Sequence, residues 1–236
     1  LHRNHAHRLI EEFMLAANTC AADFLTRTNR LGLYRVHEGS TPEKLGQLRE
    51  YLRGMGLSLG GGDEPSSLDF SKLLNAVKAR DDYEVIQTMI MRSMSQAIYT
   101  PENSGHFGLA YKSYTHFTSP IRRYPDLLNH RVIKAQLKRR KYMPKVEGFE
   151  RAPDEPLKEY EHSVWERLGV VLSAYERRAD EASYDVQAWL KCWYVREHIG
   201  EVFSGKVTGV TNFGLFVTLD NFYVEGLVHI SELDSE

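Results

Sequence analysis

Two cysteines are all that this 236-residue chain contains, and their placement excludes several kinds of protein. Cys20 and Cys192 lie far apart and neither belongs to a CxxC pair, so a disulfide-stabilised fold or a structural zinc site is not expected. The sequence also lacks an apolar run of bilayer length, and its N-terminus lacks the pattern of a secretory signal. Two unpaired thiols and no membrane segment predict a cytoplasmic protein without a membrane partner.

The chain also has no large excess of positive or of negative charge. The formal net charge is −2, which argues against a generally basic coat for nucleic acid. The basic residues are nevertheless clustered, because between residues 122 and 145 a single acid, Asp126, accompanies Arg122, Arg123, Arg131, Lys134, Lys138, Arg139, Arg140, Lys141 and Lys145. Such a run is either a solvated helix face or an electrostatic track for a polyanion.

Helical periodicity dominates up to about residue 199, and alternation replaces it from Gly200 onward. The apolar spacing predicts helices over 10–25, 41–57, 68–77, 83–98 and about 157–197. The alternation predicts strands near 202–208, 215–219 and 224–230. We therefore expect an α+β chain, with a mainly helical domain over 1–199 and a partial β-barrel over 200–236. Three strands leave open edges, so the chain is expected to stop inside this last domain.

The segment 114–130 combines aromatic residues with two adjacent arginines. Thr118 and Ser119 are good N-cap residues and Pro120 suits the first turn, so a helix is predicted to begin here. Pro125 either kinks this helix or starts a new one.

Two interpretations of Arg122 and Arg123 follow from that predicted helix start. The free amides and the positive dipole end would meet an anion where the two guanidinium groups are offered, which is a phosphate clamp. Alternatively, both arginines pair with carboxylates on a structural helix. The motif alone favours neither.

The β unit carries the motifs FGLF and GLVHIS. Phe213 and Phe216 could lie on one exposed face with His229 from the next strand, and such rings form a stacking platform for bases. Ordinary barrel-core aromatics are the alternative. The stretch resembles the OB-fold RNA-binding module typified by ribosomal protein S-one, and this resemblance implies Phe213, Phe216 and His229 as RNA contacts.

Five further motifs occur upstream in a fixed order: HRLIEEFMLAAN (7–18), YRVHEG (34–39), HFGLA (106–110), TSPIRRYPDL (118–127) and ERRADE (176–181). Followed by the OB-type module, they resemble the C-terminal part of the catalytic domain of the RNB family of 3′-to-5′ exoribonucleases. The resemblance covers essentially the whole chain. It implies processive, magnesium-dependent hydrolysis of single-stranded RNA to nucleoside 5′-monophosphates, without a small-molecule cofactor.

The same resemblance implies roles for two residues in particular. Arg122 matches the arginine that contacts the scissile phosphate, where a fixed positive charge stabilises oxygens that gain charge as water attacks. Glu11 matches the residue near the 3′-terminal ribose, where a carboxylate that accepts from the 2′-OH distinguishes RNA from DNA. A solvated acid at a helix start is the alternative for Glu11.

Four other residues are candidate RNA contacts, for which ordinary structural roles are the alternative. Tyr114 either lines an RNA channel or packs the lead-in to the arginines, and Arg123 accompanies Arg122. Arg177 and Arg178 either face RNA phosphates or form i,i+4 pairs with the acids around them on the predicted long helix.

A magnesium site is not expected in this chain. The RNB family places its metal-binding aspartates upstream of the IEE element, where residues 1–8 offer only His2, His5 and His7. Magnesium prefers oxygen ligands, so a solvated helix start accounts better for these histidines. Asp180, Glu181 and Asp185 are likewise better read as the polar face of the long helix. We therefore expect the chain alone to be inactive or nearly so.

Two hypotheses of other classes compete with this one. The first is a non-catalytic RNA-binding module, in which a helical domain presents the OB-type platform. The second is a purely structural helical domain, which conflicts with the paired FGLF and GLVHIS motifs.

Overall fold

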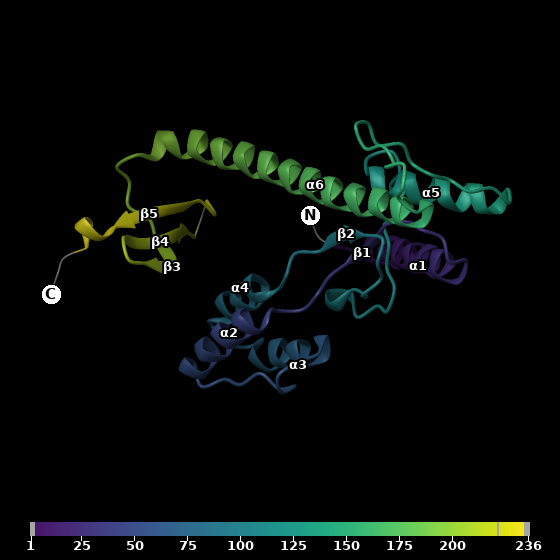
Figure 1. Cartoon of the computed structure of the whole chain (residues 1–236). Helices are drawn as coiled ribbons and strands as arrows, with labels where there is room; N and C mark the ends of the chain where they lie inside the picture. The colour runs from purple at the N-terminus through teal and green to yellow at the C-terminus, as the bar shows by residue number, and fades with distance from the viewer. Residues whose placement is uncertain (1–2, 221, 234–236) are drawn as a thin grey trace. The chain divides into compact units, whose positions relative to one another are not determined.

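The computed structural model describes residues 3–220 and 222–233 of the chain (Figure 1). Two compact units divide it, Leu1–Tyr175 and Glu176–Glu236. His2 of the histidine triplet and the last three residues of the predicted β unit lie outside the described residues. The expected mainly helical region followed by a small antiparallel sheet is confirmed, while the predicted domain boundary at 199/200 stays a prediction.

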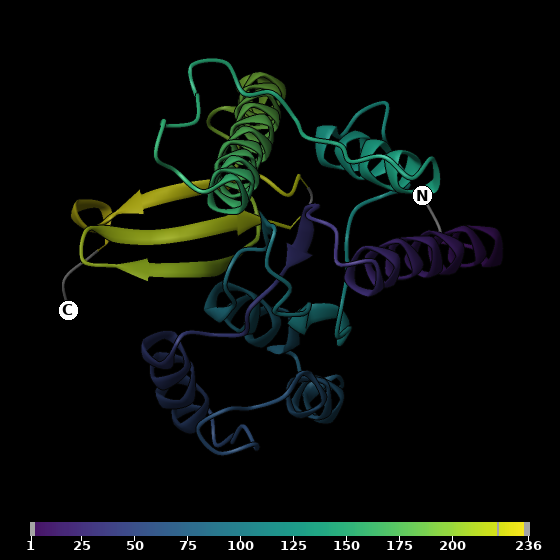
Figure 2. The same ribbon diagram turned by 45° about the vertical axis from the view of Figure 1, so that its right-hand side comes forward.

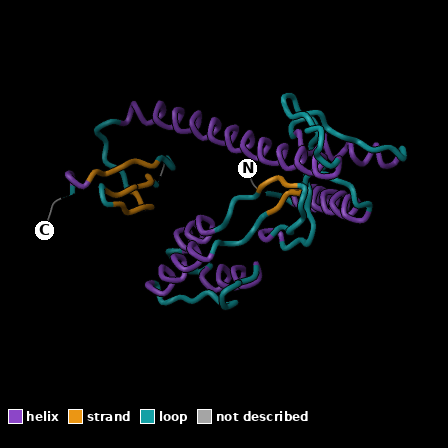
Figure 3. Tube along the Cα trace, in the orientation of Figure 1, coloured by secondary structure: helices purple, strands orange, loops and turns teal. Residues whose placement is uncertain are grey.

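The first unit is built from helices and one short pair of strands. In chain order its elements are α1 (His5–Arg27), β1 (Tyr34–Val36), α2 (Pro42–Gly54), α3 (Ser67–Val77), α4 (Tyr83–Ser93), β2 (Ile98–Thr100), the 3-10 turn η1 (Phe107–Leu109), α5 (Tyr124–Leu137) and the first part of α6 (Leu157–Val195). Figure 3 shows how few residues of this unit are in strands.

Helices α2, α3 and α4 form a layer with its own hydrophobic core. The predicted start of α2 is confirmed, because the Thr41 side chain accepts a hydrogen bond from the amide of Lys44 and Pro42 opens the helix. One apolar face of each helix turns inward, which buries Leu45, Leu48, Leu52, Phe70, Leu73, Val77, Ile86 and Ile90. Figure 1 shows these three helices grouped together.

Strands β1 and β2 pair antiparallel, which corrects the predicted helix over 83–98. Helix α4 ends at Ser93, and Ile98 then pairs with Val36 while Thr100 pairs with Tyr34. The partner strand lies more than sixty residues upstream. Apolar spacing is a local signal and cannot reveal such a long-range pairing, so the end of this stretch still matched a helix. The two strands enter a second core with Leu25, Leu33, Leu128 and Trp165.

Strand β2 packs directly against α6, at a position that only a glycine allows. A Cβ on Gly169 would lie 2.4 Å from the carbonyl oxygen of Tyr99, which is far inside van der Waals contact. One turn later the Ser173 hydroxyl accepts a hydrogen bond of 2.9 Å from the Tyr99 amide. The backbone of β2 therefore lies against α6, because Gly169 has no side chain to keep it away and the Ser173 hydroxyl forms a hydrogen bond with it.

The second unit joins the rest of α6 and the 3-10 turn η2 (Arg196–His198) to a three-stranded antiparallel sheet (Figure 2). Its strands are β3 (Gly205–Thr211), β4 (Gly214–Leu219) and β5 (Glu225–His229), in that spatial order, followed by η3 (Ile230–Glu232). Gly214 closes the β3–β4 turn at φ +155, and a Cβ there would lie 2.2 Å from the carbonyl oxygen of Val228. All three predicted strands are confirmed.

The packing of β2 on α6 predicts opposite effects for two Gly→Ala substitutions. Gly169→Ala should lower the free energy of unfolding by about 1–3 kcal/mol, because the methyl group forces α6 away from the Tyr99 carbonyl. Gly46→Ala in α2 is the matched control, since a Cβ there meets nothing within 4 Å and alanine favours the helix by up to about 1 kcal/mol. Urea unfolding of both variants measures this, and equal effects would refute the close approach.

Candidate functional site

The arginine segment forms a turn, and the helix begins four residues later than predicted. The amides of Arg122 and Arg123 donate to the carbonyl oxygen of Ser119 at 3.2 and 3.0 Å, and α5 starts at Tyr124 with Pro125 in its first turn. Of the two roles considered for Pro125, the start of a new helix is confirmed. The predicted helix start at residues 118–120 was wrong, because the turn at Ser119 does not continue into a helix and its amide is held by a side chain of α5.

That side chain is Asp126, whose carboxylate is fully buried. Its Oδ1 accepts from the Ser119 amide at 2.8 Å and from Nη2 of Arg123 at 2.8 Å. A buried carboxylate is costly unless a cation pairs with it, so Arg123 is committed to Asp126. The carboxylate interpretation of the motif is therefore correct for Arg123.

Arg122 differs from its neighbour in every one of these respects. Its side chain is exposed, and among the residues that the structure describes none forms a hydrogen bond or ion pair with it. Ile121 beside it is completely exposed. The turn from Ser119 thus fixes one arginine inside the protein and presents the other to solvent. Whether Arg122 contacts phosphate stays a prediction.

Tyr114 lies inside the protein and joins α1 to the arginine segment. It is 4% exposed, and its hydroxyl accepts a hydrogen bond of 2.9 Å from the Asn18 side chain of α1. The same Asn18 accepts from the Phe117 amide at 3.0 Å, and the Phe117 ring stacks on His130 at 3.9 Å between centroids. In this arrangement Tyr114 supports the segment from behind and does not offer its ring to a ligand.

Glu11 occupies the same face of α1 as Asn18, because residues seven apart lie two turns apart on one side of a helix. The two positions are about 10 Å apart along the axis at 1.5 Å per residue. Glu11 is half-exposed and pairs with Arg3. It therefore lies on the side of α1 that faces the arginine segment, and its role toward a ribose stays a prediction.

Two histidines near this segment are kept neutral by their surroundings. Burial lowers the pKa of His116 to about 3, with the charges of Arg123 and Arg35 acting in the same direction. Burial likewise lowers the pKa of His106 to about 4, with His37 and Arg35 adding to the effect. His116 belongs to the aromatic lead-in and His106 to the HFGLA motif, but the sequence could not predict their lowered pKa values, since burial depends on long-range packing.

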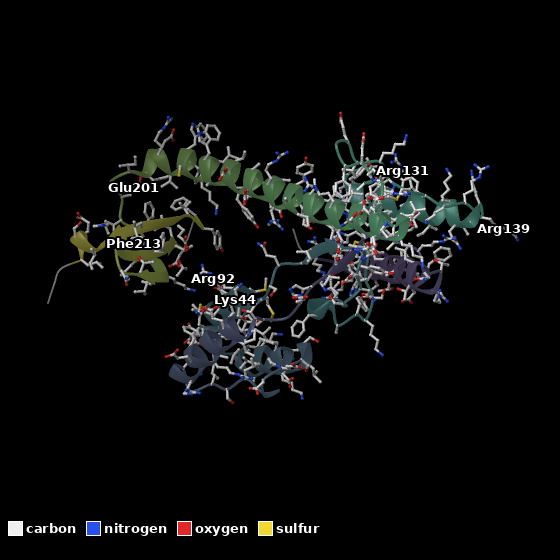
Figure 4. The ribbon with its side chains drawn as sticks, in the orientation of Figure 1. Lys44, Arg92, Arg131, Arg139, Glu201 and Phe213 are labelled. Atoms are coloured by element: carbon white, nitrogen blue, oxygen red, sulfur yellow. The ribbon has the colours of Figure 1, made fainter. Side chains whose placement is uncertain are left out.

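The β unit places its three predicted RNA contacts close together. The rings of Phe213 and Phe216 meet edge to face at 6.2 Å between centroids. Gly214 pairs with His229 and Phe216 pairs with Leu227, so Phe216 and His229 share one face of the sheet. Phe213 is 48% exposed and labelled in Figure 4. The opposite face holds Val207, Val210, Leu215, Val217 and Val228, as expected of a barrel interior.

Arg177 and Arg178 lie on α6 in the second unit, and both side chains are exposed. Arg178 takes part in a further contact within the protein. Because they belong to a different compact unit from Arg122, their contribution to one common site stays a prediction.

One group of side chains in the described part of the chain has the spacing of metal ligands. Glu102, His162 and Glu166 converge, and the two nitrogens of His162 lie 3.6 and 3.5 Å from the carboxylates. The exposed carboxylates and the histidine suit an ion pair at least as well as a metal. A histidine ligand also does not suit magnesium.

No helix in the described ranges 3–220 and 222–233 combines the length and the apolarity needed to cross a membrane.

Comparisons with known proteins agree with the motifs. The model of the RNB domain matches residues 1–139, and the model of the S1 RNA binding domain matches residues 197–236. The chain is 48% identical over 236 residues to "Ribonuclease R" of Escherichia coli strain K12, covering 99% of this chain and 28% of that relative. It is 41% identical over 234 residues to "Ribonuclease R" of Thermotoga maritima, covering 98% of this chain and 31% of that relative.

Solved structures show the same fold. The structure of Mycoplasma genitalium RNase R in complex with ribose methylated single-stranded RNA superposes with a TM-score of 0.84 at 26% identity, over 100% of this chain and 35% of the other. Yeast Ssd1, described as a pseudonuclease, superposes with a TM-score of 0.72 at 21% identity, over 97% of this chain and 27% of the other. The chain thus spans less than a third of the length of these curated relatives.

The neutral histidines predict a loss of stability in mild acid. Their pKa values lie below the unfolded value of about 6.5, so the unfolded chain takes up protons first, and the stabilisation present above pH 6.5 is lost as the pH falls toward about 4 for His106 and about 3 for His116. The upper limit is about 1.4 kcal/mol per pH unit for each histidine, and solvent screening reduces it.

Urea unfolding at pH 7, 6 and 5 measures this dependence. Carboxylates remain largely ionised in that range, so the histidines dominate the slope. His116→Gln should flatten the slope, whereas Lys134→Ala on the exposed side of α5 should not. An unchanged slope in His116→Gln would show that burial of this imidazole is not the cause.

Proposed function

The chain belongs to the RNB family, and from this premise we propose that it forms part of a magnesium-dependent 3′-to-5′ exoribonuclease that releases nucleoside 5′-monophosphates from single-stranded RNA. The observation that carries the proposal is the difference in surroundings between the two adjacent arginines. Arg123 neutralises buried Asp126, while Arg122 is exposed and lacks a partner among the described residues.

A fixed, unpaired cation on a well-held turn is what phosphodiester cleavage requires of a protein side chain. In the transition state the non-bridging oxygens gain negative charge, and a guanidinium already in place stabilises that charge without reorganisation. The backbone that carries Arg122 is held in place, because its turn is closed by two backbone hydrogen bonds to Ser119 and anchored through Asp126, while the exposed side chain is free to meet a phosphate. Its planar fork also permits bidentate contact with a phosphate.

Glu11 supplies the preference for RNA in this proposal. Its carboxylate lies on the face of α1 that the arginine segment contacts through Asn18. An acceptor at that place can take a hydrogen bond from a ribose 2′-OH, which DNA lacks. The ion pair with Arg3 is exposed, so exchanging it for a ribose contact costs little.

The β unit supplies an RNA-binding surface that does not depend on catalysis. Phe213, Phe216 and His229 gather at one end of the sheet, on the side opposite the apolar barrel face. Bases of any sequence stack on such rings, which suits a processive enzyme that accepts many sequences.

Magnesium would orient and activate the attacking water when bound. The described residues do not suit it, since the only convergent group of ligands among them includes His162 and two exposed glutamates. We place the magnesium ligands outside this chain, and we expect the chain alone to be inactive or nearly so.

A non-catalytic RNA-binding protein is the second candidate function. Its support is the pair of rings of Phe213 and Phe216, on which bases can stack without a metal ion or an attacking water. The arginine turn and the stacking face would then bind RNA without cleaving it. Magnesium-dependent shortening of RNA by the complete protein separates the two functions.

The role of Arg122 is tested in the complete protein. Arg122→Ala should slow magnesium-dependent shortening of a 3′-terminal single-stranded RNA by roughly 10²–10³-fold, because transition-state charge loses its stabilising group. RNA affinity should change far less, since one phosphate contact among many is lost. Single-turnover degradation and filter binding measure the two effects.

Lys112→Ala is the matched control for this experiment, because it removes an exposed charge from the lead-in to the same segment. It should leave the rate unchanged. An equal loss of rate and of affinity in Arg122→Ala would contradict a transition-state role for this arginine.

The stacking face is tested by single substitutions in the complete protein. Phe213→Ala and Phe216→Ala should each weaken RNA binding by about 1–3 kcal/mol if one base stacks on each ring. Val202→Ala, which lies before β3 and is 98% exposed, should leave affinity unchanged. Filter binding with unchanged affinity in both phenylalanine variants would assign these rings to packing.

A further inference from the structure

A cavity lies in the first unit, at the far end of α5 from Arg122. The cavity is about 630 Å³ in volume, and it is bounded by the C-terminal end of α1, the chain that follows α5 and the start of α6. Helix α5 has 14 residues, so its two ends are about 20 Å apart at 1.5 Å per residue. The cavity is therefore separate from the arginine turn.

Four cations from three separate stretches of chain converge on this cavity. Arg30 follows α1, Arg140 and Lys141 follow α5, and Lys158 opens α6. The only acid in the lining is Glu161, which is buried and already paired with Lys141. The lining thus carries three positive charges that its own carboxylate does not balance.

The remaining cations have few partners of their own. Arg30 donates through Nε to Gln136, a neutral acceptor, at 2.7 Å. Within the described ranges the side chains of Arg140 and Lys158 form no hydrogen bond or ion pair. Gathering like charges around one hollow is unfavourable unless an anion balances them, so the arrangement points to an anionic ligand.

The backbone after α5 directs the chain back toward the cavity. The amides of Arg139 and Arg140 donate to the carbonyl oxygens of Gln136 and Ala135, which is a Schellman turn. Its left-handed position, at φ +55, is occupied by Arg139 where glycine would be less strained. Figure 4 labels Arg139 just beyond the end of α5.

The lining also contains aromatic and amide side chains besides its cations. Tyr34, Tyr142 and Trp165 contribute aromatic surface, and Asn29 and Asn103 contribute side-chain amides. The half-buried ring of Tyr142 is oriented by a hydrogen bond from Arg131 to its hydroxyl. The volume far exceeds that of a phosphate ion and leaves room for a base beside it.

We infer that this cavity is a binding site for a nucleoside monophosphate, with the phosphate held by Arg140 and Lys158 and the base against Tyr142. A 5′-monophosphate carries nearly two negative charges at neutral pH, which offset most of the three unbalanced positive charges of the lining. Of the lining residues, His162 lies near the exposed carboxylates of Glu102 and Glu166, which do not themselves line the cavity.

The test uses the whole 236-residue chain with adenosine 5′-monophosphate as the probe in titration calorimetry. The double variant Arg140→Ala, Lys158→Ala should bind at least tenfold more weakly than the unsubstituted chain. Both side chains are exposed, so the fold should be unaffected. The matched control is Lys134→Ala with Lys138→Ala, which removes the same charge from exposed positions of α5 outside the lining, and it should bind normally.

Adenosine and inorganic phosphate separate the two halves of the ligand. Adenosine should not bind measurably, and inorganic phosphate should bind more weakly than the nucleotide. Tyr142→Leu should weaken nucleotide binding while leaving phosphate binding unchanged.

Three outcomes would overturn the inference. They are no binding of the nucleotide at millimolar concentration, an equal loss of affinity in the pocket and control variants, and loss of binding in Arg122→Ala alone. The last result would move the bound nucleotide to the arginine turn.

Discussion

The organisation of the first unit depends on one buried side chain, Asn129 of α5. Its amide nitrogen donates to the carbonyl oxygen of Leu33 and to the Thr115 hydroxyl, and its amide oxygen accepts from the Leu33 amide at 2.9 Å. Chain segments nearly one hundred residues apart are thereby fixed on one helix. Because all of these groups are buried, loss of the amide would leave several donors and acceptors unpaired at once, which is more costly than loss of a surface contact.

The reactivity assigned to the arginine turn follows from this anchoring. Asn129 holds the segment at Thr115 from one side of α5, and Asp126, one turn earlier, holds Ser119 and Arg123. With both ends of the segment fixed, the intervening chain has little freedom to bring Arg122 back to a protein carboxylate. An arginine that cannot reach a partner remains available to a phosphate. Its exposure is thus a consequence of buried polar contacts on either side.

The structural features that could be predicted from the sequence are those with a local signal in it. The helix over 157–197 and the strands after Gly200 were predictable, because apolar spacing and alternation directly reflect which faces are buried. The end of α4 and the start of α5 were not, since β1 pairs with β2 across more than sixty residues and Asp126 captures Ser119 across a turn. Both arginines have helical spacing to Asp126, i,i+4 for Arg122 and i,i+3 for Arg123, so the sequence could not show which of the two pairs with it. The cavity beside Trp165 had no signal in the sequence, because residues from four distant segments line it.

The dipole of α5 distinguishes the two basic regions at its ends. At the C-terminal end the partial charge is negative, which stabilises the cations Lys134 and Lys138. At the N-terminal end the partial charge is positive, and two arginines there are disfavoured. Asp126 in the first turn compensates one of them. The charge of Arg122 has no such compensation among the described residues, so an anion bound there is favoured both by the guanidinium and by the helix behind it.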